Sequence, residues 1–295
     1  MNEAALVELR NVCKRYPGVV ALDDVTLTLR AGTVTALAGE NGAGKSTLIK
    51  VLSGAVRADS GEVRVGGKPL PSNPGDVIRA GVSTIYQELT DVPEMSVLDN
   101  VLLARHERTL GFLREKRNRR LAAAALARVG LKGFDLHRPL SSLSPAQRQL
   151  LEIARCLARD ARVLIFDEPT SSLPEADVEA LKGIIRQLRG EGLAILYVSH
   201  HLEELFAIAD DIIVMRDGSV VASSQRANGH SPNLCAPCSR RISRTPIPGR
   251  TARRARCSLR SKTLWRPACG RPVLPLGPAR SSALSGSMAP AAPNS

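Results

Sequence analysis

One segment carries residue types at a spacing that suits phosphate binding, because 39–47 matches the pattern G-x-x-x-x-G-K-[ST]. Its residues are, in order, Gly39, Glu40, Asn41, Gly42, Ala43, Gly44, Lys45, Ser46 and Thr47. Glycines let backbone N–H groups wrap a phosphate, Lys45 can reach the β- and γ-phosphates, and the Ser46 hydroxyl can bind Mg²⁺. A β-prone run, 34–38, precedes the segment and a helix-prone run, 46–52, follows it. The sequence therefore predicts a site for a nucleoside triphosphate and Mg²⁺.

A pair of acidic residues is the second chemical signal. Asp167 and Glu168 follow the wholly apolar run 163–166, which is typical of a buried strand in a parallel sheet. At such a strand end, Asp167 can hold Mg²⁺ through water, and Glu168 can polarise an attacking water as a general base. The alternative is two solvated acids at a strand end, and a phosphate-binding loop upstream argues against it.

Three further residues stand at predicted strand ends or helix starts, where nucleotide sites gather in α/β proteins. Gln87 follows the predicted strand 83–86, and His200 follows the predicted strand 195–199. Ser144 suits the N-cap of a helix, and such a helix start can bind an anion. A single Gln or His is more often structural, so the interpretation of these residues depends on the order of all the motifs.

The elements that position these residues alternate between strands and helices, which indicates an α/β domain with a parallel sheet. Period-two and wholly apolar runs predict strands at 6–9, 25–29, 33–38, 62–65, 82–86, 162–166, 194–198 and 212–215. Helical periodicity predicts helices at 46–52, 76–80, 97–104, 117–129, 144–159, 174–189 and 201–209. We predict one domain over 1–222, with a helical insertion at about 90–160.

Composition separates residues 223–295 from the rest of the chain. This tail holds 13 of the 41 basic residues and none of the 28 acidic ones, which leaves 28 of each in 1–222. Its low-complexity, Arg-, Pro- and Ser-rich composition cannot bury a core and predicts disorder. Its Cys235-x-x-Cys238 pair lacks the second pair that a zinc site needs. The chain shows no signal-peptide pattern and no apolar run of about 18 residues that would predict a membrane span.

The order of the motifs resembles the ATP-binding subunits of ABC transporters over about residues 5–222. The matching pieces are Tyr16 as the adenine-stacking aromatic, the P-loop at 39–46, Gln87 as the Q-loop residue, the signature at 143–147, Walker B at 163–168, the D-loop at 171–173 and His200 as the switch histidine. The fold that this resemblance implies is a P-loop NTPase of ABC type. It would have a RecA-like core with a mixed sheet, an N-terminal antiparallel β subdomain and a helical subdomain.

The resemblance also implies roles for the matching residues. ATP would be bound by Tyr16 and the P-loop and hydrolysed with Mg²⁺. The residues implied to hold Mg²⁺ are Ser46, Gln87 and Asp167. The residues implied to be catalytic are Glu168, His200 and Gln87. His200 would contact the γ-phosphate, and Gln87 would sense both the metal and the membrane partner.

Three stretches, 19–22, 39–44 and 85–89, look most like the importers of ribose, galactose, xylose and arabinose. In that group the subunit is a peripheral protein on the cytoplasmic face of the inner membrane. It energises monosaccharide uptake with permease subunits and, through them, a sugar-binding protein. Members normally carry two fused ATPase halves. This chain resembles the first half, so a second ATPase domain would have to come from elsewhere, for example from a second copy of the chain.

The signature departs from the common L-S-G-G-Q, because Pro145 and Ala146 stand in place of the two glycines. Pro145 suits the first position of a helix but removes one N–H donor. The resemblance implies that Ser144, Ala146 and Gln147 face the ATP bound by the partner domain. A degenerate signature is usual for the first half in the sugar group.

The tail and the function both admit alternatives. The tail is either a basic arm for acidic partners or out-of-frame translation, which we favour. Shifted reading of 227–238 and 280–295 permits sequences that resemble the family's linker and the P-loop of its second half. Alternative functions are a soluble ABC-type ATPase acting on nucleic acid or ribosomes, and a truncated inactive remnant. We do not expect nucleic acid as a partner, because the gap 46–143 is transporter-sized and holds no heptad run.

Overall fold

The computed structural model describes residues 5–225, with gaps at 89, 104, 106–107, 110–111 and 172. All of the described residues fall in the first of the chain's two units, Met1–Thr245. The predicted tail begins at residue 223, but residues 223–225 form the end of a strand, Ser219–Gln225, which pairs with Asp211–Arg216. The rest of the predicted tail, including its cysteines, lies outside the described residues, as do Leu89 and Ser172 of the D-loop. In the part of the chain that the structure describes, no helix combines the length and the apolar character needed to cross a membrane.

A six-stranded sheet in the order β12-β11-β3-β10-β9-β6 forms the centre of the domain. Its strands are β3 (Val34–Ala38), β6 (Val82–Ile85), β9 (Val163–Asp167), β10 (Ala194–Val198), β11 (Asp211–Arg216) and β12 (Ser219–Gln225). The strands from β11 to β6 are parallel and β12 is antiparallel to β11, so the predicted mixed sheet is confirmed. Sequence periodicity misses β12, which returns from β11 through Asp217 and Gly218, both at positive φ, a pairing typical of a tight hairpin turn.

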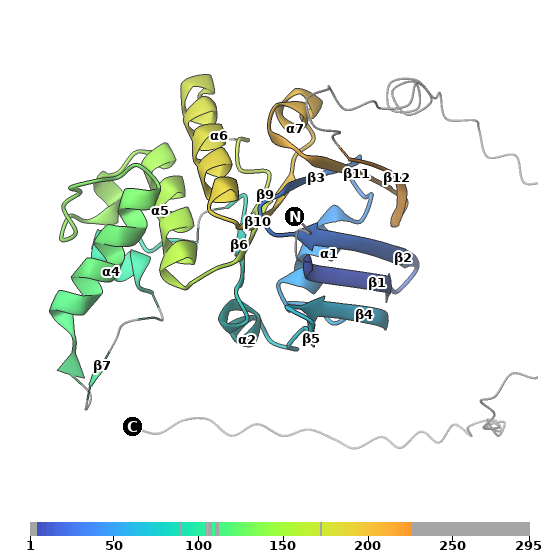
Figure 1. Cartoon of the computed structure of the whole chain (residues 1–295), viewed down its shortest axis with the longest axis horizontal. Coiled ribbons are helices and arrows are strands. Elements are labelled where there is room, and N and C mark those ends of the chain that lie inside the picture. The colour runs from blue at the N-terminus through green and yellow to red at the C-terminus, as the bar shows by residue number, and fades with distance from the viewer. Residues whose placement is uncertain are drawn as a thin grey trace, which may run out of the picture. The chain divides into compact units, whose positions relative to one another are not determined.

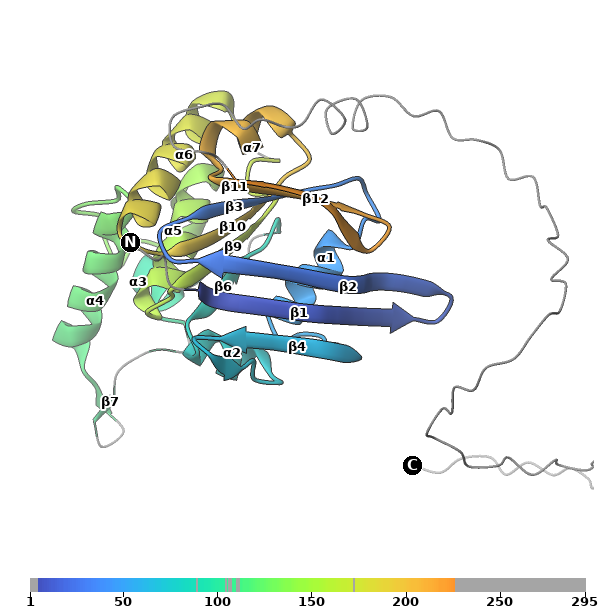
Figure 2. The same ribbon diagram turned by 45° about the vertical axis from the view of Figure 1, so that its right-hand side comes forward.

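A second, antiparallel sheet has the order β2-β1-β4-β5. It consists of β1 (Ala5–Tyr16), β2 (Val19–Arg30), β4 (Ser60–Val65) and β5 (Lys68–Pro69). Figure 2 shows β1 and β2 as a long hairpin below the central sheet. Val7 and Leu9 are buried while Arg10 is exposed, the alternation expected of a sheet with one face on the core. The predicted N-terminal antiparallel subdomain is confirmed.

Seven α-helices lie in the described residues. They are α1 (Lys45–Leu52), α2 (Pro74–Arg79), α3 (Val97–Val101), α4 (Glu115–Arg128), α5 (Pro145–Ala158), α6 (Glu175–Gly190) and α7 (Leu202–Ile208). Helices α3, α4 and α5 contact one another and form the predicted helical subdomain, on the left of Figure 1. The predicted helix 97–104 is too long, because α3 ends at Val101.

The central strands are buried on both faces, as the apolar run 163–166 predicts. Phe166 and Tyr197 pack in a core shared with α5, α6 and α7. Ile165 and Leu196 point to the opposite face and pack in a core shared with α1, β1 and β2. Helix α1 therefore lies between the two sheets, and the loops at the carboxyl ends of the strands rest on a rigid centre.

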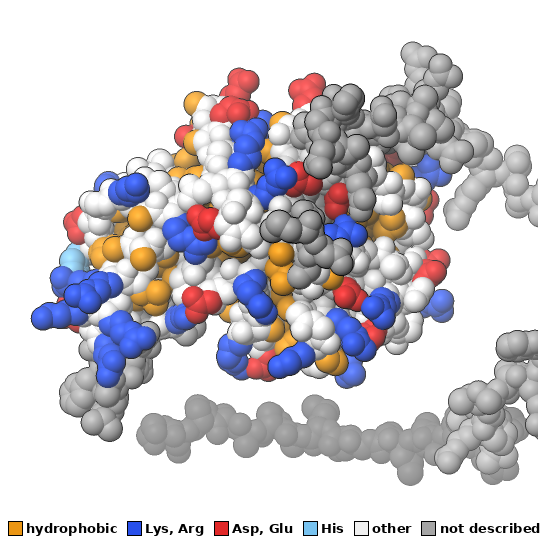
Figure 3. Space-filling model, in the orientation of Figure 1, with side chains coloured by type: hydrophobic (Ala, Val, Ile, Leu, Met, Phe, Trp, Pro, Cys, Tyr) orange, Lys and Arg blue, Asp and Glu red, His pale blue; other side chains and the backbone are white. Residues whose placement is uncertain are grey.

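Charged side chains are distributed unevenly over the face shown in Figure 3. Lys and Arg side chains gather over the α4 end of the molecule, whereas both signs mix over the sheets. The exposed basic residues of α4 are Lys116, Arg117, Arg119 and Arg120. This mixture over the sheets agrees with the equal numbers of basic and acidic residues in 1–222.

Candidate nucleotide-binding site

The predicted phosphate loop connects β3 to α1 and is wedged between two other strands. A Cβ atom at Gly39 would lie 2.6 Å from the Met215 carbonyl oxygen of β11, and one at Gly44 would lie 2.5 Å from the Ala21 carbonyl oxygen of β2. Gly44 also has φ +102°. Glycine is therefore required at both positions, because any side chain would collide with backbone.

The loop is shaped to receive an anion at the start of α1. The helix has no side-chain cap and no acidic residue in its first turn, so its first N–H groups have no partner within the helix and present positive potential. The Lys45 side chain is buried, and its Nζ donates to the carbonyl oxygens of Gly39 and Glu40 at 2.7 and 3.1 Å. Ser46 is exposed beside it. These groups fit a bound nucleotide phosphate.

Backbone hydrogen bonds hold Ala43, in the middle of the loop, at both its N–H and its carbonyl oxygen. The Ala43 N–H donates to the Glu40 carbonyl oxygen at 3.1 Å, and the Ala43 carbonyl oxygen accepts from the Gly218 N–H at 3.1 Å. Ala43 is buried, whereas Asn41 and Gly42 are exposed. Ala43 is therefore held in place, while Asn41 and Gly42 remain accessible to a ligand.

Asp167 ends β9 and lies within the electrostatic reach of the phosphate loop. Burial and the charge of Glu168 raise the pKa of the Asp167 carboxyl, and the positive charges of Lys45 and Lys50 act in the opposite direction. Helix α1 packs against β9, which explains how lysines of α1 reach an acid that is more than 100 residues away in sequence. A bound cation would complete the charge balance of this acid.

Glu168 and His200, both predicted to be catalytic, lie side by side. The His200 Nδ1 is 3.3 Å from the Glu168 Oε2, and the side chains are 50% and 20% exposed. Glu168 has φ +49°, a left-handed conformation that a non-glycine residue seldom adopts. Its N–H donates to the Val198 carbonyl oxygen at 2.9 Å. The parallel pairing of β9 with β10 places both residues just beyond neighbouring strand ends.

Tyr16 and Gln87, which are also predicted to act at the nucleotide site, are both exposed. Tyr16 is 39% exposed at the end of β1, with the Lys14 Nζ 5.5 Å from its ring centroid. Val19 and Val20, at the start of β2, are also exposed, so this hairpin tip offers an apolar surface to a base. Gln87 is exposed after β6. Among the described residues, Gln87 has no hydrogen bond to the phosphate loop.

The signature residues begin α5, as predicted. The Ser144 hydroxyl accepts from the Gln147 N–H at 3.2 Å, and the Gln147 side chain accepts from the Ser144 N–H at 3.1 Å, which forms a capping box. Pro145 is the first residue of the helix, and Ala146 is half-buried. Helices α5 and α1 lie apart in both Figure 1 and Figure 2, so the signature belongs to a separate surface of the domain.

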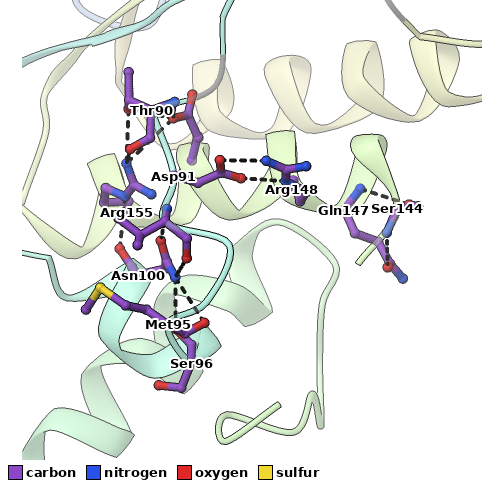
Figure 4. Close-up of polar contacts among 11 residues, drawn as sticks. Thr90, Asp91, Met95, Ser96, Asn100, Ser144, Gln147, Arg148 and Arg155 are labelled. Atoms are coloured by element: carbon purple, nitrogen blue, oxygen red, sulfur yellow. Dashed lines mark hydrogen bonds and ion pairs between the residues drawn. The ribbon is translucent and has the colours of Figure 1, made fainter. Parts of the chain in front are cut away.

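Sequence reasoning misses a polar cluster that joins α5 to the segment after Gln87 (Figure 4). Arg148 donates two hydrogen bonds to Asp91, at 2.6 and 2.7 Å. One turn later, the buried Glu152 carboxylate accepts from the Thr90 N–H and hydroxyl, both at 2.7 Å. The spacing of polar residues along one face of α5 is the sequence signal that could have found this cluster.

Arg155 extends the same cluster by another turn of α5. Its Nε donates to the Asn100 carbonyl oxygen at 2.9 Å, and its Nη1 donates to the Thr90 carbonyl oxygen at 3.2 Å. The Asn100 side chain in turn bonds both the N–H and the carbonyl oxygen of Val92 at 2.9 Å. The cluster therefore fixes 90–92 to α3 and α5.

Comparisons with known proteins agree with this geometry. The family model described as ABC transporter matches residues 22–171. Ribose import ATP-binding protein RbsA 3 of Rubrobacter xylanophilus is 48% identical over 219 residues, which are 74% of this chain and 44% of that protein. Arabinose import ATP-binding protein AraG of Yersinia pestis is 46% identical over 220 residues, which are 74% of this chain and 42% of that protein. The chain thus spans less than half the length of these relatives.

A solved structure shares the fold. The ADP conformation of MJ1267, an ATP-binding cassette of an ABC transporter, superposes with a TM-score of 0.68 at 26% sequence identity, covering 75% of this chain and 91% of that one. The fold predicted from the order of the motifs is therefore confirmed. Since the family model matches half of its length and its fold is that of a solved cassette, the chain belongs to the ABC transporter family.

Proposed function

We propose that this chain binds ATP and Mg²⁺ and hydrolyses the ATP to energise the import of a monosaccharide through a membrane permease. The observation that carries the proposal is the convergence of Lys45, Asp167 and the Glu168–His200 pair at the carboxyl ends of β3, β9 and β10. The sugar as cargo is supported by the names of the relatives, which are ribose and arabinose import ATP-binding proteins.

The residues divide the work of binding. Tyr16 and its apolar neighbours offer a face on which adenine stacks, and the uncapped N–H groups at the start of α1 hold the phosphates. The Lys45 ammonium group, which donates to the Gly39 and Glu40 carbonyl oxygens in this structure, would donate to phosphate oxygens when ATP is bound. The Ser46 hydroxyl, Asp167 and Gln87 would hold Mg²⁺, which neutralises charge on the phosphates when bound.

Glu168 and His200 act on the reacting atoms. The Glu168 carboxylate accepts a proton from the attacking water, which makes the water a better nucleophile. The His200 Nδ1 lies 3.3 Å from that carboxylate, and the exposed His200 ring would contact the γ-phosphate. The pair thus orients the water with respect to the phosphoryl group.

The partners follow from the same assignment. A permease would receive the conformational signal through Gln87 and the segment after it, and a sugar-binding protein would deliver the sugar to that permease. The chain would act as a peripheral subunit on the cytoplasmic face of the membrane. Ser144, Ala146 and Gln147 would close the ATP site of a second ATPase domain, supplied by a second copy of the chain or by another cassette.

Calorimetric titration of ATP into the full chain tests the nucleotide site directly. Lys45→Ala removes the buried ammonium group from the loop, so we expect at least a tenfold loss of ATP affinity, roughly the value of one charge-assisted hydrogen bond. Lys68→Ala, at an exposed residue of β5, is the matched control and should bind ATP as the wild type does. Unchanged affinity in Lys45→Ala would contradict the assignment of the site.

A further inference from the structure

Glu204, near the start of α7, is the centre of a hydrogen-bond cluster that sequence motifs do not identify. One oxygen of its carboxylate, Oε2, accepts from the Thr170 hydroxyl at 2.8 Å, the Tyr197 hydroxyl at 3.2 Å and the Ser199 hydroxyl at 3.3 Å. Thr170, Tyr197 and Ser199 are buried. A carboxylate is the one side chain that can accept from three hydroxyl groups without competing as a donor.

The three donors belong to two separate segments of the chain. Thr170 lies two residues after Glu168, on the turn that follows β9. Tyr197 and Ser199 lie in and just after β10, and Ser199 immediately precedes His200. The Ser199 hydroxyl also accepts from the His201 N–H at 3.0 Å. Glu204 therefore bonds both to the turn that follows Glu168 and to the end of the strand that precedes His200.

The turn after β9 has a strained backbone, so hydrogen bonds from neighbouring elements are needed to keep it in this conformation. Glu168 has φ +49°, and a non-glycine residue holds this conformation only where the surroundings enforce it. The buried Gln149 of α5 donates to the Pro169 carbonyl oxygen at 2.5 Å and holds the middle of the turn. Glu204 holds the next residue, Thr170. Burial and the charge of Glu204 raise the pKa of the Tyr197 phenol, so its hydroxyl stays a donor.

We propose that Glu204 is a positioning residue that fixes Glu168 and His200 in one geometry by joining the turn after β9 to the end of β10. The side chain of Glu204 acts through Thr170 and Ser199, not on the nucleotide. This inference rests on the proposed roles of Glu168 and His200 in hydrolysis. The new element is that a residue of α7, outside the predicted motifs, sets the distance between the Glu168 and His200 side chains.

The test uses the full chain with Glu204→Ala and Glu204→Gln. Hydrogen exchange followed by mass spectrometry reports on the peptides covering 166–171 and 197–203 without any need for turnover. We expect faster exchange in both peptides together in Glu204→Ala and a smaller effect in Glu204→Gln, which keeps one acceptor oxygen. Glu203→Gln, an exposed neighbour on the same helix, is the control and should exchange as the wild type does.

Kinetics separate positioning from a merely structural role. Glu204→Ala should lower kcat for ATP about ten- to a hundredfold, as expected for a small displacement of catalytic groups, while the ATP affinity measured in EDTA stays that of the wild type. Wild-type exchange in both peptides would overturn the proposal, and so would an ATP affinity lost in parallel with kcat. If Glu204→Ala does not fold, Glu204→Gln decides by the same two measurements.

The same experiments distinguish this inference from the proposed function. If Glu168→Gln hydrolyses ATP at the wild-type rate, the proposed catalytic role fails whatever Glu204 does. If Glu168→Gln is inactive but Glu204→Ala exchanges and turns over like the wild type, the positioning role fails and the catalytic role stands. In the double variant, removal of Glu204 should lower the rate by a smaller factor than it does in the wild type, because part of its effect is exerted through Glu168.

Discussion

At the scale of single residues, the hydrolysis proposed above depends on one carboxylate held in an unusual backbone conformation. Glu168 follows the last residue of β9, has a left-handed φ and meets the ring of His200. Its position beyond a buried strand keeps it half-buried but accessible to water. Asp167, one residue earlier, lies within the electrostatic reach of the lysines of α1. The two adjacent acids therefore have different neighbours, because the charges of Lys45 and Lys50 act on Asp167 while the His200 ring lies against Glu168.

The role of Glu168 can be measured by replacing its carboxylate with an amide. Glu168→Gln keeps the size of the side chain but cannot accept a proton, so ATP hydrolysis should fall about 10²- to 10⁴-fold. ATP binding should remain, because the phosphate loop is unchanged. A phosphate-release assay and a calorimetric titration check the two parts. Glu175→Gln, at the start of α6, is the control, and equal rates for both variants would remove Glu168 from the general-base role.

At the scale of elements, helix α5 connects the signature to the segment that follows Gln87. Three side chains of α5 contact this segment or α3, namely Arg148, Glu152 and Arg155. The capping box fixes the first turn of the same helix. A movement of 90–92 would therefore be transmitted to the start of α5, because the helix and the segment are bonded at successive turns (Figure 4).

The ion pair between Asp91 and Arg148 makes a testable contribution to this junction. The Asp91 side chain is 3% exposed and that of Arg148 is 27% exposed. Asp91→Asn should destabilise the domain by about 1–3 kcal/mol at pH 7, since a buried charged acceptor is lost. Urea unfolding measures the difference. Glu179→Gln, which removes the ion pair of the exposed Glu179 with Lys182, is the control and should leave the urea midpoint close to that of the wild type.

The same pair predicts how stability depends on pH. The hydrogen bonds from Arg148 hold the pKa of the Asp91 carboxyl below its usual value. A lowered folded-state pKa means that the stabilisation is fully present above the unfolded-state pKa of about 3.9 and is lost as the pH falls through the folded-state value. The difference in unfolding free energy between wild type and Asp91→Asn should shrink below about pH 4. A constant difference down to acid pH would contradict this origin of the stability.

At the scale of the whole molecule, the domain carries its phosphate loop and its signature on separate surfaces (Figure 1 and Figure 2), so its own signature does not contact its own nucleotide site. We propose that a second cassette supplies the missing signature, and that a second copy of this chain can do so. Sedimentation of Glu168→Gln with ATP and Mg²⁺ should show a dimer, because this variant retains bound ATP, while the nucleotide-free chain should sediment as a monomer. Adding Ser144→Arg should abolish the dimer by placing bulk and charge at the signature. A monomer under all conditions would point to a different partner.

The tail poses a separate question for the whole chain. We propose that residues beyond about 222 are read in a shifted frame. The nucleotide sequence decides this directly, because the shifted frame must encode the family's linker and then a degenerate P-loop over 227–238 and 280–295. Codons that exclude those readings would contradict the proposal. A basic arm would instead give nucleic-acid binding that weakens with salt and disappears when 226–295 is deleted.

Features that depend only on neighbours along the chain can be predicted from the sequence. The phosphate loop, the acids after an apolar strand and the cap of α5 are local patterns, because each needs only a few consecutive residues in one backbone conformation. Their order was enough to predict the α/β fold with its helical insertion. Sequence pattern failed at β12, since that strand adds to an edge that only the completed sheet creates.

Contacts between side chains that are distant in sequence depend on how the elements pack in three dimensions. Thr170 and Glu204 are 34 residues apart, Gln149 and Pro169 are 20 apart, and Asp91 and Arg148 are 57 apart. A hydroxyl, an amide or a carboxylate can bond many partners equally well, so composition and periodicity do not choose among them. The choice is made by the packing of α5 and α7 against the central sheet, which brings these groups within hydrogen-bond distance and excludes water that would otherwise compete.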